Sequence, residues 1–186
     1  MKAWHFTADK LRDGRPLPRN GRWLKHDGPV EICKSGLHAS REPFDALQYA
    51  PGDTLCLVEV EDVVKEQDDK LVARRRKIIA RIDATKLLRY FARMQALSCL
   101  DKWQDNPPDV VLAYLMTGDE TLRSVAESAA WSAAWSATWN AAESAAWSAT
   151  WNAAWSAAES AAGSAAESAA RAEFNALVYE TFADYL

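Results

Sequence analysis

Hydrophobic and polar residues alternate in short runs along the first 82 positions, with the two-residue period of half-buried β-strands. The first run, KAWHFT, is followed by a turn-rich segment at 11–28, which is predicted to form a loop or hairpin. The runs TLCLVEV and LVARRRKIIARI give the strongest strand signals, because they concentrate Val, Ile and Leu. The predicted strands cover residues 2–7, 30–33, 36–38, 54–60 and 71–82.

The spacing of apolar residues changes to a helical period in three other places, which predicts helices over 44–50, 84–100 and 109–116. Ser40 and Asp83 are predicted to cap the first two. Gly118 is predicted to close the third, and we expect a hinge there. Strands followed by helices predict an α+β fold, with a small mixed β-sheet in the N-terminal domain.

The C-terminal part of the chain repeats the unit x-Ser/Asn-Ala-Ala/Thr from Glu127 to Arg171 without interruption. Alanine is the best helix former, and the repeat contains no proline and a single glycine, so we expect one continuous helix that begins near Asp119. Six tryptophans stand at the leading position of the unit: Trp131, Trp135, Trp139, Trp147, Trp151 and Trp155.

A four-residue step turns a helix by ~400°, so these tryptophans form a spiral that covers roughly 240° of its circumference. One neighbour can cover the single apolar stripe of an ordinary helix, whereas a spiral needs neighbours on several sides. Burial of six indoles would contribute on the order of 25 kcal/mol per chain before association costs. We therefore expect this long Ala/Trp-rich helix to oligomerise with copies of itself. The alternative is an exposed helix whose repeat was expanded by replication slippage.

These patterns divide the chain into an α+β head domain at 1–83, a helical connector at 84–118 and a tetrad-repeat helix at 119–186. Uncharged stretches at 128–142 and 144–158 are shorter than the ~20 apolar residues of a membrane-spanning helix, so no membrane partner is expected. The N-terminus lacks the apolar run of a signal peptide, which predicts a cytoplasmic protein.

Charge is distributed unevenly, although the net charge is only −4. Residues 127–186 contain a single basic side chain, Arg171, and seven acidic ones, which argues against DNA as a partner. The basic run at 74–77 lies in a predicted strand, where alternate side chains face opposite ways. We expect it to divide between solvent and acidic side chains, the alternative being a grip on a phosphate or an acidic partner.

The cysteines are odd in number and widely spaced in apolar surroundings, which predicts reduced core thiols for Cys33, Cys56 and Cys99. The histidines are His5, His26 and His38, and neither they nor the cysteines show the spacing of metal ligands. No metal site is predicted.

Several segments resemble a family of uncharacterised proteins encoded by bacteriophages and prophages. The resemblance rests on KAWHF at the start, GLHAS at 36–40, DALQYAPG at 45–52, DKLVARRR at 69–76 and the Trp/Ala/Ser tail. It implies a small accessory protein of a virus, expressed in the cytoplasm of an infected bacterium and acting on host or defence machinery. The family carries no established activity.

The order of motifs in the head is also similar to the core of ADP-ribosyltransferases. In that fold a His-Gly-Thr/Ser strand holds the nicotinamide ribose of NAD, a Gly-x-Tyr-x-Ala strand precedes an Ala-x-x-Tyr helix, and a later Glu polarises the ribose. The resemblance places His5 and Thr7 on the first motif, Gly36 and His38 on the second, and Ala46 and Tyr49 on the third.

The match departs from the family pattern, because Phe6 stands in place of glycine and His38 in place of tyrosine. Asp69 is the nearest candidate for the catalytic acid, with a shorter reach than glutamate. The residues also allow structural roles: a half-buried, hydrogen-bonded histidine for His5, a core side chain for Tyr49 and a tight turn for Gly36.

Two hypotheses follow. The preferred one is a non-enzymatic, self-assembling accessory protein whose helix displays several heads and gains avidity for a host protein or a small nucleotide signal. The alternative is an ADP-ribosyltransferase-like enzyme that binds NAD, or a related nucleotide, through His5, Thr7 and Tyr49 and activates it with Asp69.

Overall fold

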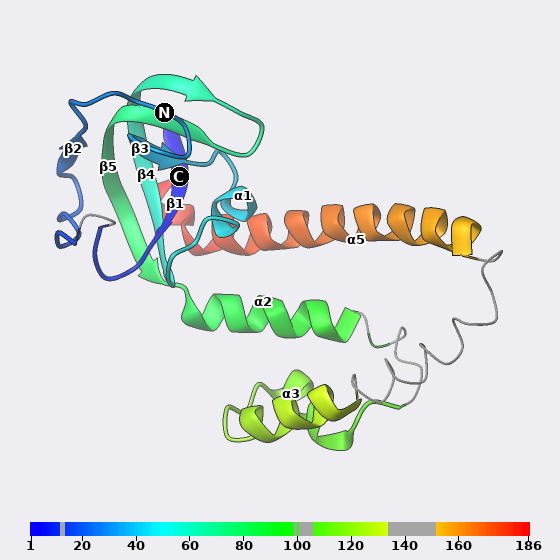
Figure 1. The fold of residues 1–186 in the computed structure, drawn as a ribbon. Helices are drawn as coiled ribbons and strands as arrows, with labels where there is room; N and C mark the ends of the chain where they lie inside the picture. The colour runs from blue at the N-terminus through cyan, green and yellow to red at the C-terminus, as the bar shows by residue number, and fades with distance from the viewer. Residues whose placement is uncertain (12–13, 99, 101–105, 134–151) are drawn as a thin grey trace. The chain divides into compact units, whose positions relative to one another are not determined.

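The computed structural model describes residues 1–11, 14–98, 100, 106–133 and 152–186, with side chains from residue 166 onward in the last segment (Figure 1). The chain forms two compact units. The head unit combines Met1–Leu88 with Arg171–Leu186, and the helical unit comprises Arg89–Ala170. The α+β prediction is confirmed, but the last sixteen residues pack with the N-terminal sheet although the sequence placed them with the repeat helix.

A five-stranded sheet forms the centre of the head unit, in the order β1-β4-β5-β2 with β3 also on β5. Every described strand pair is antiparallel, so the sheet is antiparallel rather than mixed. The predicted strand at 30–33 is not formed, because residues 31–35 close a tight turn through an isolated Glu31–Ser35 bridge. The strands are β1 (Lys2–Thr7), β2 (Trp23–Lys25), β3 (Leu37–Ala39), β4 (Thr54–Glu66) and β5 (Leu71–Asp83).

The sheet closes into a small barrel at Ser40, directly after β3. Ser40 and Trp4 exchange two backbone hydrogen bonds of 2.7 and 2.9 Å, which join the end of β3 to β1. The predicted helix cap at Ser40 is therefore wrong: the residue belongs to the sheet, and α1 (Pro43–Leu47) follows Glu42 without a side-chain cap. Closure leaves few unpaired strand edges.

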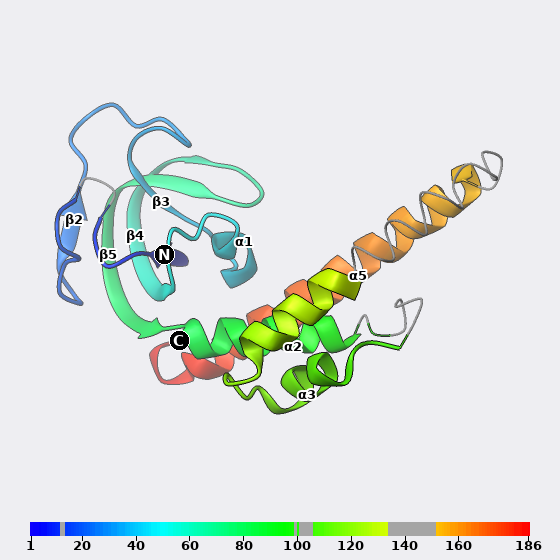
Figure 2. The ribbon, with the colours of Figure 1, turned by 60° about the horizontal axis from the view of Figure 1, so that its bottom comes forward.

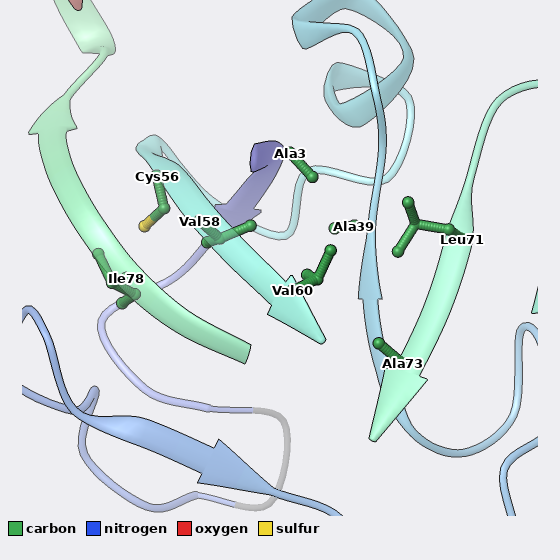
Figure 3. Packing of buried hydrophobic residues seen from close by; sticks show 8 residues of the cluster. All are labelled: Ala3, Ala39, Cys56, Val58, Val60, Leu71, Ala73 and Ile78. Carbon is green, nitrogen blue, oxygen red and sulfur yellow. The ribbon is translucent and has the colours of Figure 1, made fainter. Parts of the chain in front are cut away.

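Small and branched apolar side chains form a cluster in the barrel interior (Figure 3). The long strands β4 and β5 are strongly curved, as two views of the ribbon show (Figures 1 and 2). Register shifts between Leu57 and Val58 and between Val63 and Lys65 accompany the curvature, as β-bulges do. The interior cluster consists of Ala3, Ala39, Cys56, Val58, Val60, Leu71, Ala73 and Ile78.

A second apolar layer covers the outer face of β1, where Trp4 and Phe6 alternate with the inward residues. Its other half comes from the far end of the chain, the last turns of α5 (Asn152–Thr181) and Phe182, which directly precedes the exposed η2 (Ala183–Tyr185). Trp4 lies edge to face against Phe182, with ring centroids 5.1 Å apart. Phe174, Val178 and Phe182 are fully buried at a spacing of four residues, as one helix face requires.

Polar contacts around Glu42 and Asp45 hold this C-terminal segment on α1. Tyr179 Oη donates to the Glu42 carboxylate over 2.5 Å, and the Phe44 backbone N–H donates to Asn175 Oδ1 over 2.9 Å. Arg171 forms an ion pair with Asp45, whose side chain is only 7% exposed. The two chain ends also meet, because Lys2 Nζ donates to the backbone oxygens of Tyr185 and Leu186.

Helices predicted from periodicity are found close to their expected positions, as α2 (Thr85–Ser98) and α3 (Asp109–Thr117). Asp83 Oδ1 accepts the Thr85 N–H, as expected for a cap. Gly118 closes α3 in the left-handed region at φ 68° and donates to Tyr114 O. Residues 123–133 form the next helix, beginning slightly later than predicted, because Asp119 accepts the Thr121 N–H in a local turn.

The helical unit has its own small core of Val111, Leu115 and Ala126. Arg93 Nη1 donates to Leu115 O and Arg89 pairs with Glu120, which adds polar links within the unit. Among the described residues, no helix combines the length and the apolar character needed to cross a membrane.

Candidate functional site

His5 and Thr7, the first two predicted ligand residues, both lie on β1. His5 is on the inward side of the strand, and Thr7 is its last residue. His5 is half-buried and lies opposite Cys56 of β4 in the strand register. Thr7 is buried, and its hydroxyl donates to Ala8 O over 3.2 Å. The hydroxyl of Thr7 therefore serves the local backbone, whereas His5 faces the barrel interior.

Gly36 and His38 lie on either side of the start of β3. Gly36 has φ 108°, and a Cβ there would come within 2.5 Å of Val72 Cγ2. This conformation and close approach require glycine. His38 Nε2 accepts the Cys33 backbone N–H over 2.9 Å, which holds the 31–35 turn against β3. Both residues thus have structural roles at this turn.

Tyr49 and Asp69, the predicted stacking and acid residues, contact each other directly. Tyr49 Oη donates to the Asp69 carboxylate, and Lys70 Nζ donates to Tyr49 Oη over 3.0 Å. Lys70 Nζ also lies 4.7 Å from the centroid of the Tyr49 ring. The Tyr49 hydrogen bond and the Lys70 charge lower the pKa of Asp69, so it is an ionised acceptor rather than a proton donor.

The prediction that the basic run at 74–77 divides between solvent and acidic side chains is correct for Arg75 and Lys77 and wrong for the buried Arg76. Arg75 pairs with Glu61 over 2.5 Å and Lys77 with Glu59 over 2.6 Å, and both cations lie over the Trp23 ring. These two side chains are engaged on one face of β5.

Arg76 of the same run turns the other way and is the functional candidate that the sequence reasoning missed. It is only 6% exposed and lies opposite Val60, a residue of the interior cluster. Its Nη1 donates to His38 O, which ties β5 to β3. The sequence could have indicated this, because Arg76 stands two residues before the inward-facing Ile78 and alternate residues of a strand share one face.

Arg76, His5 and Cys56 are polar residues of the barrel interior. Burial lowers the pKa of Arg76 to about 10, which still leaves it cationic at neutral pH. Burial, then the charges of Arg76 and His38, lower the pKa of His5 well below 6.5. Burial raises the pKa of the Cys56 thiol to about 11. The interior therefore holds a fixed positive charge, a neutral imidazole and a protonated thiol.

Lowering the pH is expected to destabilise the head unit through His5. Its pKa is lower in the folded state than the ordinary 6.5, so below about pH 6.5 the unfolded chain takes up a proton that the folded chain does not. The free energy of unfolding should fall by at most about 1.4 kcal/mol per pH unit through this group. Urea titrations from pH 7 to 5 measure it, and His5→Gln should show a shallower fall. Equal slopes in the two proteins would contradict the assignment.

Cysteine environments differ from the prediction of three core thiols. Cys56 is buried, as predicted, but Cys33 is exposed, because it lies in the 31–35 turn with φ 68°. Cys99 lies outside the described residues. Within the ranges that the structure describes, no three His, Cys, Asp or Glu side chains gather as metal ligands.

The repeat is described at its two ends. Trp131, in the helix at 123–133, is 75% exposed. Trp155 belongs to α5. Trp135, Trp139, Trp147 and Trp151 lie outside the described residues, so the predicted continuity of the helix is not tested there.

Comparison with known proteins finds a family match for the N-terminal part of the chain. Residues 1–90 match the family described as Domain of unknown function (DUF7666). This match covers the sheet and the start of α2 but not the C-terminal segment that packs on β1. No curated protein and no solved structure matches the chain.

Proposed function

We propose that this protein is a self-assembling binding protein, encoded by a phage and acting in the cytoplasm of its bacterial host. The tryptophan repeat assembles several copies, and the head units bind a host or defence component, either a protein or a small nucleotide signal. The observation that carries the proposal is the exposed indole of Trp131 at the start of the repeat. A single exposed tryptophan is unremarkable, but the sequence continues the same position through five more.

Serine residues of the repeat fit a helix surface that packs against other helices. Ser128 and Ser132 donate to the backbone oxygens four residues earlier, each over 3.0 Å. Their hydroxyls are thus satisfied within the helix and can be covered without losing a hydrogen bond. Alanine between them permits close approach of a second backbone.

The order of the segments along the chain supports separate regions for self-assembly and for binding of a partner. Both flanks of the helical unit, Met1–Leu88 and Arg171–Leu186, fold together into the head unit. The repeat is therefore an insertion within the head sequence, so that each copy added to an assembly brings one complete head. Multiple heads on one assembly raise the effective concentration for a partner that also offers several sites.

Replacement of Trp131, Trp135 and Trp151 together by alanine is expected to reduce the assembly to monomers. Each indole buries ~150–200 Å² at a helix contact, so their loss removes several kcal/mol per chain. Light scattering coupled to size exclusion measures the mass at micromolar concentration. Met116→Ala is the matched control, because Met116 is 72% exposed on α3 outside the repeat. A monomeric wild-type protein, or an unchanged mass for the triple variant, would refute assembly through the indoles.

The second candidate function is an NAD-using, ADP-ribosyltransferase-like activity. The contact that favours it is the hydrogen bond between Tyr49 and Asp69, which joins two of the residues that the resemblance nominates. Incubation of the purified protein with NAD decides between the two functions. Nicotinamide release that His5→Ala abolishes would support the enzyme, and no release together with no thermal shift would exclude it.

A further inference from the structure

Arg76 places a guanidinium inside the barrel with only part of its hydrogen-bonding capacity used. In the part of the chain that the structure describes, its one hydrogen bond runs from Nη1 to His38 O, and it makes no ion pair. A guanidinium has five N–H donors, and a buried cation without a partner is costly. A residue that served only to join β5 to β3 would not need a charge.

The unused edge of this guanidinium reaches solvent. No fully buried side-chain nitrogen or oxygen among the described residues lacks a partner, so Nε and Nη2 of Arg76 each retain some access to water. These two atoms form the edge that binds oxyanions in a bidentate manner. Arg41 shows the geometry in the same unit, where Nε and Nη2 donate to the two carboxylate oxygens of Glu66.

His5 adds a second nitrogen donor to the same interior. The Trp4–Ser40 bridge joins β1 to the end of β3, so His5 follows directly after the point where β1 meets the strand whose His38 carbonyl accepts the Arg76 hydrogen bond. The Arg76 charge also contributes to the lowered pKa of His5, and His5 is half-buried. A neutral imidazole offers one N–H, so the pair can supply three donors in all. Cys56 opposite His5 contributes a thiol and no negative charge. Three donors around a fixed positive charge suit the tetrahedral oxygens of a phosphate better than the two oxygens of a carboxylate.

We propose that Arg76 and His5 form a binding site for the phosphate group of a small ligand inside the head barrel. The site shares His5 with the residues predicted from the sequence, but Arg76 supplies its charge and Tyr49 and Asp69 take no part. It goes beyond the proposed function by naming the ligand chemistry, and it does not depend on self-assembly. Free phosphate and the phosphate of a nucleotide share this chemistry.

Calorimetric titration of the full chain tests the site with inorganic phosphate, AMP and acetate at constant ionic strength set by chloride. We expect phosphate or AMP to bind and acetate to bind at least about tenfold more weakly. Tighter binding of AMP than of phosphate would identify a nucleotide as the source, and equal binding would identify the free anion. Binding of acetate as tight as phosphate, or heat changes that chloride reproduces, would overturn the proposal.

Arg76→Met is the decisive variant, and Arg41→Met is its matched control. Methionine keeps the volume but removes the charge, so phosphate affinity should fall at least about tenfold in Arg76→Met and stay unchanged in Arg41→Met. Without ligand, Arg76→Met should melt at the same or a higher temperature, since apolar replacement of a buried charge is often stabilising. Undiminished phosphate binding by Arg76→Met would overturn the site.

A measurement on the wild-type protein covers the case in which Arg76→Met fails to fold. The C2 proton of His5 should shift on addition of phosphate, whereas that of His26, which lies in a separate loop, should not. Parallel shifts of both protons, or none at His5, would contradict the proposal.

Discussion

Replacement of Phe182 by alanine is expected to lower the free energy of unfolding of the head unit by about 3–5 kcal/mol. Phe182 is fully buried, and its ring packs edge to face against Trp4 at 5.1 Å. The substitution removes that contact and leaves a cavity beneath β1 that the closed sheet cannot fill by collapsing. Urea unfolding followed by circular dichroism measures the change.

Tyr185→Ala is the matched control for this substitution. Tyr185 is an aromatic residue of the same C-terminal segment, and it contacts Phe182 at 6.4 Å, but it is 53% exposed. Its loss should cost much less than that of Phe182, because little buried area disappears. Equal stabilities of the wild type and Phe182→Ala, within about 0.5 kcal/mol, would show that the C-terminal segment does not complete the head core.

The role of Phe182 has a consequence for the boundaries of the head. The family match ends at residue 90, yet Trp4 and Phe44 each pack against an aromatic ring from the last sixteen residues. A fragment that stops at residue 90 exposes both rings to water. The matched domain and the physically complete unit are therefore different lengths of chain.

Arg171→Ala is expected to destabilise the head unit by about 2–4 kcal/mol. Asp45 is buried, and Arg171 is its ion-pair partner, so the substitution leaves a carboxylate in the interior without a counter-charge. The partial exposure of Arg171 keeps the loss below that of a fully buried pair. The same change also removes the guanidinium that lies 4.9 Å from the Phe44 ring centroid.

Two further variants test whether the lost stability comes from the broken Arg171–Asp45 ion pair rather than from the replacement of any arginine. Arg41→Ala breaks an exposed pair with Glu66 and should change stability little. Asp45→Asn combined with Arg171→Met should recover part of the loss, because the stranded charge is gone. A double variant less stable than Arg171→Ala would contradict the explanation by an uncompensated carboxylate.

Several elements were predictable because their cause is local. β1 follows from the alternation in KAWHFT, and the closure of α3 follows from a glycine that can adopt φ 68°. α2 was predicted within two residues at each end, because its apolar period and the Asp83 cap lie within one stretch of chain. The errors came where a distant partner decides the conformation. Ser40 has the sequence of a helix cap, but Trp4, 36 residues away, draws its backbone into the sheet.

The residues of the candidate site also include one that the sequence predicted and one that only the structure placed. Sequence nominated His5, and the structure places it toward the barrel interior, but sequence read Arg76 as one of four surface cations. Which side of a strand is buried depends on the strand register and on closure of the barrel, and residues 74–77 alone predict neither.

By itself, the sequence determined the α+β class, the main strands and helices, and the tetrad repeat. These features arise from short-range periodicity and residue propensity, which need no knowledge of distant contacts. Only the tertiary structure decided that Arg76 lies inside the barrel, that Tyr49 contacts Asp69, and that residues 171–186 complete the head. Each of these depends on strand register or on packing between segments far apart in the chain, where burial outweighs local preference.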